Sequence, residues 1–124
     1  MTGDELITAG DAFIRGHSMK NDIQNVHKLI GYTPQYDALI PELTGSETLR
    51  IFSLIRGIPK CDIRENIIRM ATDLGFEQHL KKQVKAFSGG NKRKLSTCLA
   101  LLSYPQLIFL DVSKKRILLT ILYF

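Results

Sequence analysis

The sequence predicts an α/β fold with a short antiparallel β segment, a helical region and a buried parallel strand. Three observations support it: two amphipathic helical patterns within residues 44–74, a Ser-Gly-Gly turn that opens a helical pattern at residues 88–102, and an apolar run at 106–111 that ends in Asp111. A short, continuous apolar run is typical of a strand buried in a parallel sheet. Ligands bind at the carboxyl edge of such sheets, so Asp111 becomes a candidate site residue.

Length and composition limit the number of domains and the class of protein. The 124 residues allow one small domain or a piece of a larger one, and an apolar fraction of 44% is ordinary for a globular protein. The longest apolar runs are far shorter than the ~20 residues that a membrane helix needs, and Met1–Glu5 does not resemble a signal peptide. Cys61 and Cys98 are expected to be reduced thiols, and the histidines show no zinc-ligand spacing with them.

The charge is unevenly distributed along the chain. Residues 1–80 hold 8 Lys/Arg and 11 Asp/Glu, a balance of −3, whereas residues 81–124 hold 9 and 1, a balance of +8, which together give the net +5. A basic half can indicate a nucleic-acid partner. Single-strand binders interleave aromatic side chains with the cations, however, and Phe87 is the only ring within residues 81–94. We therefore expect no nucleic-acid partner.

Two interpretations of the Ser-Gly-Gly turn compete: a phosphate-binding helix start and a capped surface helix. Ser88, Gly89, Gly90 and Asn91 begin a helix, whose unpaired N–H groups and partial positive charge favour a phosphate, and the basic run 92–94 adds to the positive field. The alternative is a capped surface helix, because serine is a good N-cap and Gly-Gly is common in loops. The turn alone does not separate the two, but an aspartate at a strand end can hold Mg²⁺ against nucleotide phosphates.

Together, residues 88–102 and the strand ending at Asp111 resemble the signature motif, signature helix and Walker B strand of an ABC transporter nucleotide-binding domain. The run 88–96 is most similar to the A subfamily, whose members move lipids. The resemblance implies a partial P-loop NTPase fold, with ATP and Mg²⁺ as cofactors. It also implies that Ser88, Gly89, Gly90 and Asn91 contact a nucleotide held by a second nucleotide-binding domain.

A second stretch supports the same resemblance. Residues 31–39, followed by 42–44, resemble the segment that contains the family's Q-loop glutamine, here Gln35. The resemblance implies that Gln35 reaches Mg²⁺ and the attacking water, and that Gln35 and Asp111 are the catalytic and metal-contacting residues for the domain's own nucleotide. The alternative for Gln35 is an ordinary polar loop residue after a proline.

At the N-terminal end, the sequence predicts a hairpin and a short helix. Leu6 to Met19 is expected to form paired strands, with residues 8–11 as the turn and residues 12–14 as the second strand. A short helix at 21–28, capped by Asn21, is expected to lead into a strand at 29–32.

The helical region carries clear start and stop signals. Thr44-Gly45-Ser46-Glu47 predicts a capping box, and the helix it opens should end at Gly57. A second helix is expected from about Asp62 to Leu74, with Gly75 after it. The side chains expected on the buried faces are Leu49, Ile51, Phe52, Ile55, Ile63, Ile67, Met70 and Leu74.

The resemblance divides the chain into a β and Q-loop part (1–35), a helical subdomain (36–86), the signature helix and Walker B strand (87–111) and a divergent tail (112–124). Two departures stand out. The chain contains no Gly-x-x-x-x-Gly-Lys-Ser/Thr motif, so the P-loop is expected upstream, and Val112 stands where the family has a catalytic glutamate. The histidine switch is missing as well. The tail could pair as a strand or remain exposed and prone to aggregation.

The resulting hypothesis is a fragment of the ATP-binding and hydrolysing domain of a transporter that couples ATP hydrolysis to transmembrane lipid transport. Its partners would be a second nucleotide-binding domain, transmembrane domains and a lipid substrate, and it would lie at the cytoplasmic face of a membrane. By itself the chain is expected to be inactive as an ATPase. The alternative is a non-catalytic isoform that binds or regulates an intact cassette.

Overall fold

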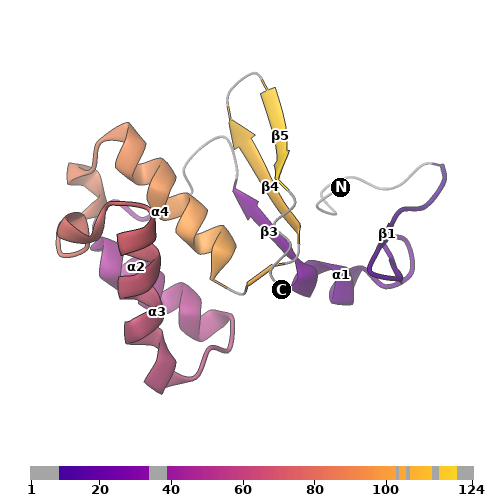
Figure 1. Ribbon diagram of the computed structural model, residues 1–124, viewed down its shortest axis with the longest axis horizontal. Helices are drawn as coiled ribbons and strands as arrows, with labels where there is room; N and C mark the ends of the chain where they lie inside the picture. The colour runs from indigo at the N-terminus through magenta and orange to yellow at the C-terminus, as the bar shows by residue number, and fades with distance from the viewer. Residues whose placement is uncertain (1–8, 34–38, 103, 106, 113–114, 120–124) are drawn as a thin grey trace.

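A helical body lies at one end of the molecule, a three-stranded sheet in the middle, and a small hairpin with helix α1 at the other end (Figure 1). This computed structural model describes residues 9–33, 39–102, 104–105, 107–112 and 115–119. It describes only the backbone at residues 32, 33, 109–112 and 115–119. Helices and a mixed sheet together make the α/β architecture that the sequence predicts.

The hairpin consists of β1 (Phe13–Ile14) and β2 (His17–Ser18), paired antiparallel. Its turn is formed by Arg15 and Gly16, with φ of +50° and +82°. These positive values match the twist of the adjoining strands, and glycine adopts them without steric cost. This turn was not predicted: Phe13–Ile14 was expected to be the second strand after a turn at residues 8–11, whereas it is the first strand of the described hairpin. Leu6–Thr8 lies outside the described residues.

Helix α1 spans Ile23–Leu29. Its N-cap is Asp22, one residue after Asn21, the cap that the sequence predicted. The Asp22 carboxylate accepts a hydrogen bond from Asn25 Nδ2 at 2.8 Å and lies 2.6 Å from His17 Nδ1. The hydrogen bond from His17 is the main reason that the pKa of Asp22 is lowered. The helix thus packs onto the hairpin through polar contacts and a small core made of Met19, Val26 and Ile30.

Helix α2 (Gly45–Ile55) starts with the expected capping box. Glu47 N donates to Thr44 Oγ1 at 3.1 Å, and Thr44 N donates to Glu47 Oε2 at 2.8 Å. Each residue satisfies a backbone donor of the other, which is what fixes the start of the helix. The helix ends before Gly57, whose φ is +76°.

The buried side of α2 differs from the expected one. Leu49 and Ser53 are fully buried, whereas Ile51 and Ile55 are 40% and 71% exposed. Leu49 and Ser53 are four residues apart and therefore share one helix face. Ser53 can occupy a buried position because its hydroxyl donates to the Leu49 carbonyl at 2.7 Å. The expectation that Ile51 and Ile55 face the core is wrong.

The rest of the helical body is formed by α3 (Lys60–Asp73), two short 3₁₀ segments, η1 (Glu77–His79) and η2 (Val84–Ala86), and α4 (Gly89–Leu101). Helix α3 begins at Lys60, before the expected start, and ends near Gly75 as expected, where φ is +66°. These elements and α2 share one core of Leu49, Ile63, Ile67, Met70, Ala71, Phe76, Leu80, Val84, Phe87, Leu95, Cys98 and Leu102.

The sheet has the order β3-β4-β5. Strand β3 (Ile30–Thr33) runs parallel to β4 (Leu107–Val112), which confirms the parallel strand expected before Asp111. Strand β5 (Lys115–Leu119) returns antiparallel on the other edge of β4, so the tail pairs as a strand, one of the two alternatives left open by the sequence.

Candidate functional site

The turn before α4 is shaped by Ser88. This residue has an extended backbone, with φ −63° and ψ 158°, and its Oγ accepts a hydrogen bond from Asn91 N at 3.2 Å. The Ser88 carbonyl accepts from Lys92 N at 2.9 Å, which closes the first turn of the helix. Ser88 is therefore a true N-cap, and this local role does not compete with a ligand for the other N–H groups at the helix start.

Gly89 and Gly90 are exposed at this helix start. A Cβ added at Gly89 would meet nothing within 4 Å, and one at Gly90 would meet only Ser88 Oγ, at 3.9 Å. Neither glycine has a positive φ, so the backbone conformation does not require glycine there. Because glycine within a helix costs roughly 0.5–1 kcal/mol relative to alanine, the local fold gives no reason for the pair. The pair does keep the backbone open to another molecule.

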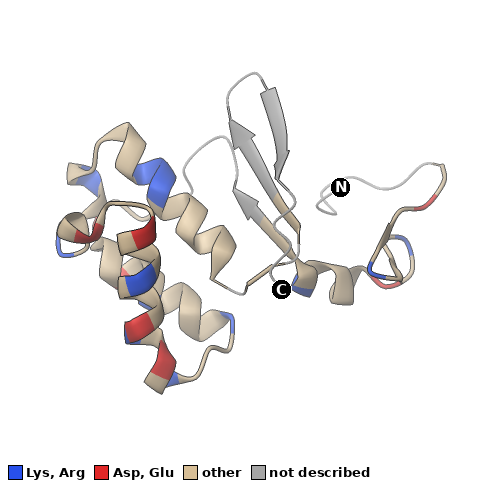
Figure 2. Cartoon of the chain, viewed as in Figure 1, with Lys and Arg blue, Asp and Glu red and all other residues tan. Residues whose placement is uncertain are grey.

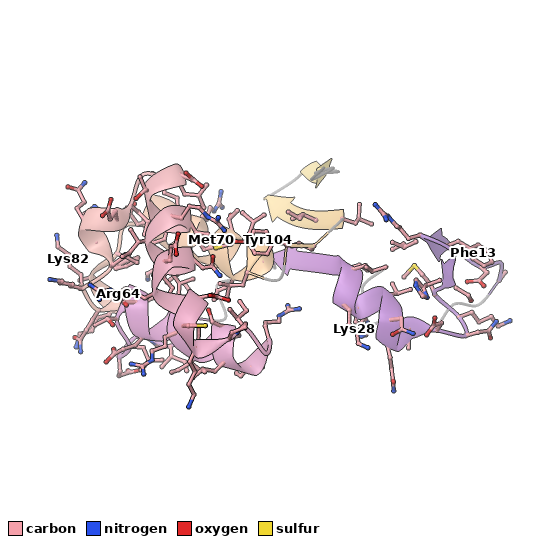
Figure 3. The ribbon with its side chains drawn as sticks, turned by 60° about the horizontal axis from the view of Figure 1, so that its bottom comes forward. Phe13, Lys28, Arg64, Met70, Lys82 and Tyr104 are labelled. Atoms are coloured by element: carbon pink, nitrogen blue, oxygen red, sulfur yellow. The ribbon has the colours of Figure 1, made fainter. Side chains whose placement is uncertain are left out.

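The cations near this turn are not equivalent. Lys94 Nζ donates to the carbonyl of Gly75 at 3.1 Å, so this lysine ties α4 to the end of α3 and contributes less to the field at the turn than the sequence suggested. Arg93 is exposed on the first turns of α4, where blue segments gather (Figure 2). Lys82 extends outward from the same end of the helical body (Figure 3). The helix start also carries no acidic residue in its first turn.

The turn rests on the core of the helical body. Phe87, directly before Ser88, is buried, and its ring would lie 3.0 Å from a Cβ added at Gly45. The ring also packs at a 58° tilt against His79, with 6.2 Å between the ring centroids. Leu95, two turns into α4, is fully buried. The position of the turn is thus set by packing on both sides of it.

Cys98 lies further along α4 and is fully buried. Burial, with a smaller contribution from the charge of Asp73, raises the pKa of its thiol to about 12. A protonated thiol is a poor nucleophile and a poor metal ligand. Cys61, by contrast, is exposed, and both cysteines are free, as expected.

The other end of α4 is fixed to the sheet through Gly31. A Cβ at Gly31 would lie 2.3 Å from the carbonyl oxygen of Ala100 and 2.8 Å from Cγ of Pro105. Only glycine allows β3 to approach α4 this closely. Gly31 was named from the sequence only within the family resemblance, although a glycine inside a strand is itself a signal of close backbone approach.

The two predicted parts of the site lie on different elements. Helix α4 runs from the Ser88 turn at the outer end of the helical body to the sheet, and its 13 residues span about 20 Å. Asp111 lies near the end of β4, one position after the pair formed by Thr33 and Leu110. That the turn and Asp111 serve different nucleotides stays a prediction.

The other predicted site residues are described only in part or not at all. Gln35 lies outside the described residues, and Asp111 is described by its backbone, in register with Arg116 of β5. Among the residues that the structure describes, no group of three or more His, Cys, Asp or Glu side chains could hold a metal ion. Within the same part of the chain, no helix has the length and apolar character needed to cross a membrane.

Comparison with known proteins identifies the class of protein to which this fold and turn belong. The model of the ABC transporter family matches residues 1–112. A solved chain described as "Structure of ATP binding subunit of ABC transporter" superposes with a TM-score of 0.63 at 24% identity, covering 77% of this chain and 40% of that one. The chain belongs to the ABC transporter family.

Its curated relatives place it in the A subfamily. "Phospholipid-transporting ATPase ABCA3" of Mus musculus is 48% identical over 111 residues, and "ATP-binding cassette sub-family A member 2" of Rattus norvegicus is 46% identical over 112. "ATP-binding cassette sub-family A member 7" of Mus musculus is 38% identical over 111 residues. Each match covers 90% of this chain but only 5–6% of the relative, so the chain corresponds to a small part of these proteins.

Proposed function

We propose that this chain is part of the ATP-binding domain of an A-subfamily transporter and that its Ser88–Asn91 turn contacts ATP held by a second nucleotide-binding domain. The observation that carries the proposal is the exposed glycine pair at the capped start of α4, where nothing in the described chain blocks a phosphate. Gln35 and Asp111 would contact Mg²⁺ and the domain's own nucleotide, since amide and carboxylate oxygens suit this ion.

The proposed parent protein moves lipid across a membrane. This part of the proposal is supported by the relatives named as phospholipid-transporting ATPases, which match nine tenths of the chain. In such a parent, ATP hydrolysis would be coupled to transport through transmembrane domains, with the ATP-binding domain on the cytoplasmic side. Residues 36–86 would form its helical subdomain, between the Q-loop part and the signature helix.

We further propose that the chain alone binds ATP weakly and does not hydrolyse it. The 124 residues contain no P-loop motif, and Val112, which follows Asp111, can neither accept a proton nor orient water. A non-catalytic role is the second candidate, in which the chain binds or regulates an intact cassette through the same turn. It is favoured by the end of the family match at residue 112, before strand β5.

Isothermal titration of the chain with Mg-ATP tests the first statement. We expect no saturable binding below roughly millimolar concentrations, because the backbone cradle that normally grips the phosphates is not encoded in these residues. Binding with micromolar affinity would contradict the proposal that the chain lacks its own working nucleotide site.

The role of the turn can be tested with an intact partner. The mouse ABCA3 nucleotide-binding domain is immobilised with Mg-ATP, and capture of this chain is compared with capture of Gly90→Asp. A carboxylate at the helix start opposes the γ-phosphate, so we expect ATP-dependent capture to fall at least tenfold. An acid in the first turn of a helix does not destabilise the fold.

Gln24→Asp is the matched control for this experiment. It adds the same charge on exposed helix α1, at the opposite end of the molecule, and should leave capture unchanged. Equal capture of wild type and Gly90→Asp, or capture that does not depend on ATP, would exclude the turn as the contact.

A further inference from the structure

Strand β5 lies outside the part of the chain that the family model matches. The family match ends at residue 112, whereas β5 is Lys115–Leu119. It nevertheless pairs with the matched strand β4 from Ile108 to Val112. A segment outside the family's pattern thus occupies the edge of the strand that carries Asp111.

The register shows why this strand must be antiparallel. Val112 pairs with Lys115, so only residues 113 and 114 separate the two strands. A connection this short allows an antiparallel return, whereas a parallel neighbour would need a crossover of a dozen or more residues. The tail therefore takes a place at the β4 edge that no parallel strand can share with it.

Without β5, this edge of β4 would be open to pairing with strands of other chains. Residues 107–110 of β4 are Leu-Ile-Phe-Leu, an apolar run without charge, and such an edge is a template for pairing with other chains. Strand β5 begins with Lys115 and Arg116, and charged residues on an edge strand discourage further pairing. In the described sheet, β3 covers the other edge of β4.

We propose that β5 is a built-in edge strand that closes this side of the sheet against strand addition by a second copy of the chain. The register also pairs Asp111 with Arg116, a placement of opposite charges that favours this alignment over its slipped alternatives. The proposal is independent of nucleotide binding, because it concerns only which strand pairs with β4.

Hydrogen exchange of the full chain tests the proposal, with light scattering as a measure of self-association. We expect protected amides in both β4 and β5 of a monomeric wild type. Arg116→Glu places like charges opposite each other, so β5 amides should exchange about two to five times faster and self-association should increase. The charge swap Asp111→Arg with Arg116→Glu should restore wild-type exchange.

Lys85→Glu is the control for net charge, since it makes the same type of change on an exposed residue of η2 and should leave β5 protected. Wild-type β5 amides that exchange at the rate of an unstructured peptide would overturn the proposal. So would an Arg116→Glu variant indistinguishable from wild type, or a charge swap that fails to restore protection.

Discussion

The helical body and the N-terminal hairpin unit are held together by different forces. Twelve buried residues form one continuous core in the helical body, whereas three form the core beneath β1, β2 and α1. The hairpin unit relies instead on polar contacts, such as the exposed one of Asp11 with Ser18 and the part-buried one of Asp22 with His17. Exposed hydrogen bonds exchange with bonds to water and add little net stability.

This difference bears on the two proposed parts of the site. The Ser88 turn stands on the large core, through Phe87 before it and Leu95 after it. The strand that leads toward Gln35 starts at Ile30, which belongs to the small core. We infer that the helical body with its Ser88 turn holds its geometry by itself, whereas the strand that leads toward Gln35 depends on the sheet.

Truncation of a side chain in the large core should have the largest effect on the free energy of unfolding. Phe76 is fully buried, and Phe76→Ala should lower the free energy of unfolding by about 3–5 kcal/mol. If the two regions are held separately, hydrogen exchange should show loss of protection in α2, α3 and α4 but little change in α1. Val26→Ala in the small core should produce the opposite pattern.

Ile55→Ala serves as the control for this prediction. Ile55 is apolar but 71% exposed, so its truncation should change the free energy of unfolding by less than about 0.5 kcal/mol. Equal loss of protection throughout the molecule in Phe76→Ala and in Val26→Ala would mean that the two regions unfold as one unit.

The same comparison shows what the sequence could predict. The capping box at Thr44, the stop at Gly57 and the parallel strand before Asp111 follow from local chemistry, and all three are present. The N-cap role of Ser88 could be predicted from the local sequence in the same way. These features depend on a few neighbouring residues, so a sequence suffices to find them.

Features that depend on the tertiary neighbourhood were missed. Apolar character alone placed Ile55 in the core, but the face of α2 that meets α3 and α4 is the one with Ser53. The tight contact at Gly31 joins residues about seventy positions apart, so no local pattern measures it. The hairpin turn at Arg15-Gly16 was missed because Gly10 offered a competing turn signal.

Gly31 lies at the contact that connects the two regions. Its substitution should have the next largest effect on the free energy of unfolding. Gly31→Ala places a methyl group 2.3 Å from a backbone oxygen of α4, which cannot rotate away, so β3 and α4 must separate. We expect a loss of about 1–3 kcal/mol in the free energy of unfolding, with faster exchange in β3 and the end of α4.

Gly89→Ala is the matched control, because its added methyl group meets nothing within 4 Å and replaces glycine in a helix. It should stabilise the chain by up to about 1 kcal/mol. A Gly31→Ala variant as stable as Gly89→Ala would show that the two regions are not joined at this contact.

The smallest expected effect is a pH dependence of the free energy of unfolding, and it measures how well the large core excludes water. The pKa of the buried Cys98 thiol is raised to about 12 in the folded chain, whereas the unfolded thiol titrates near 9. Above pH 9 the unfolded state loses a proton that the folded state keeps, so stability falls as pH rises toward 12. At pH 10 the loss should be about 1.4 kcal/mol, measured by urea unfolding against pH 8.

Other groups also titrate in this range, so the comparison between variants isolates Cys98. Cys61→Ser changes an exposed thiol and should keep the full loss, whereas Cys98→Ala should remove about 1.4 kcal/mol of it. If Cys98→Ala and Cys61→Ser lose stability equally between pH 8 and 10, water reaches the thiol in the folded state. The core beneath α4 would then be less tightly closed than the burial of Cys98 indicates, and the separate stability inferred for the Ser88 turn would lose its basis.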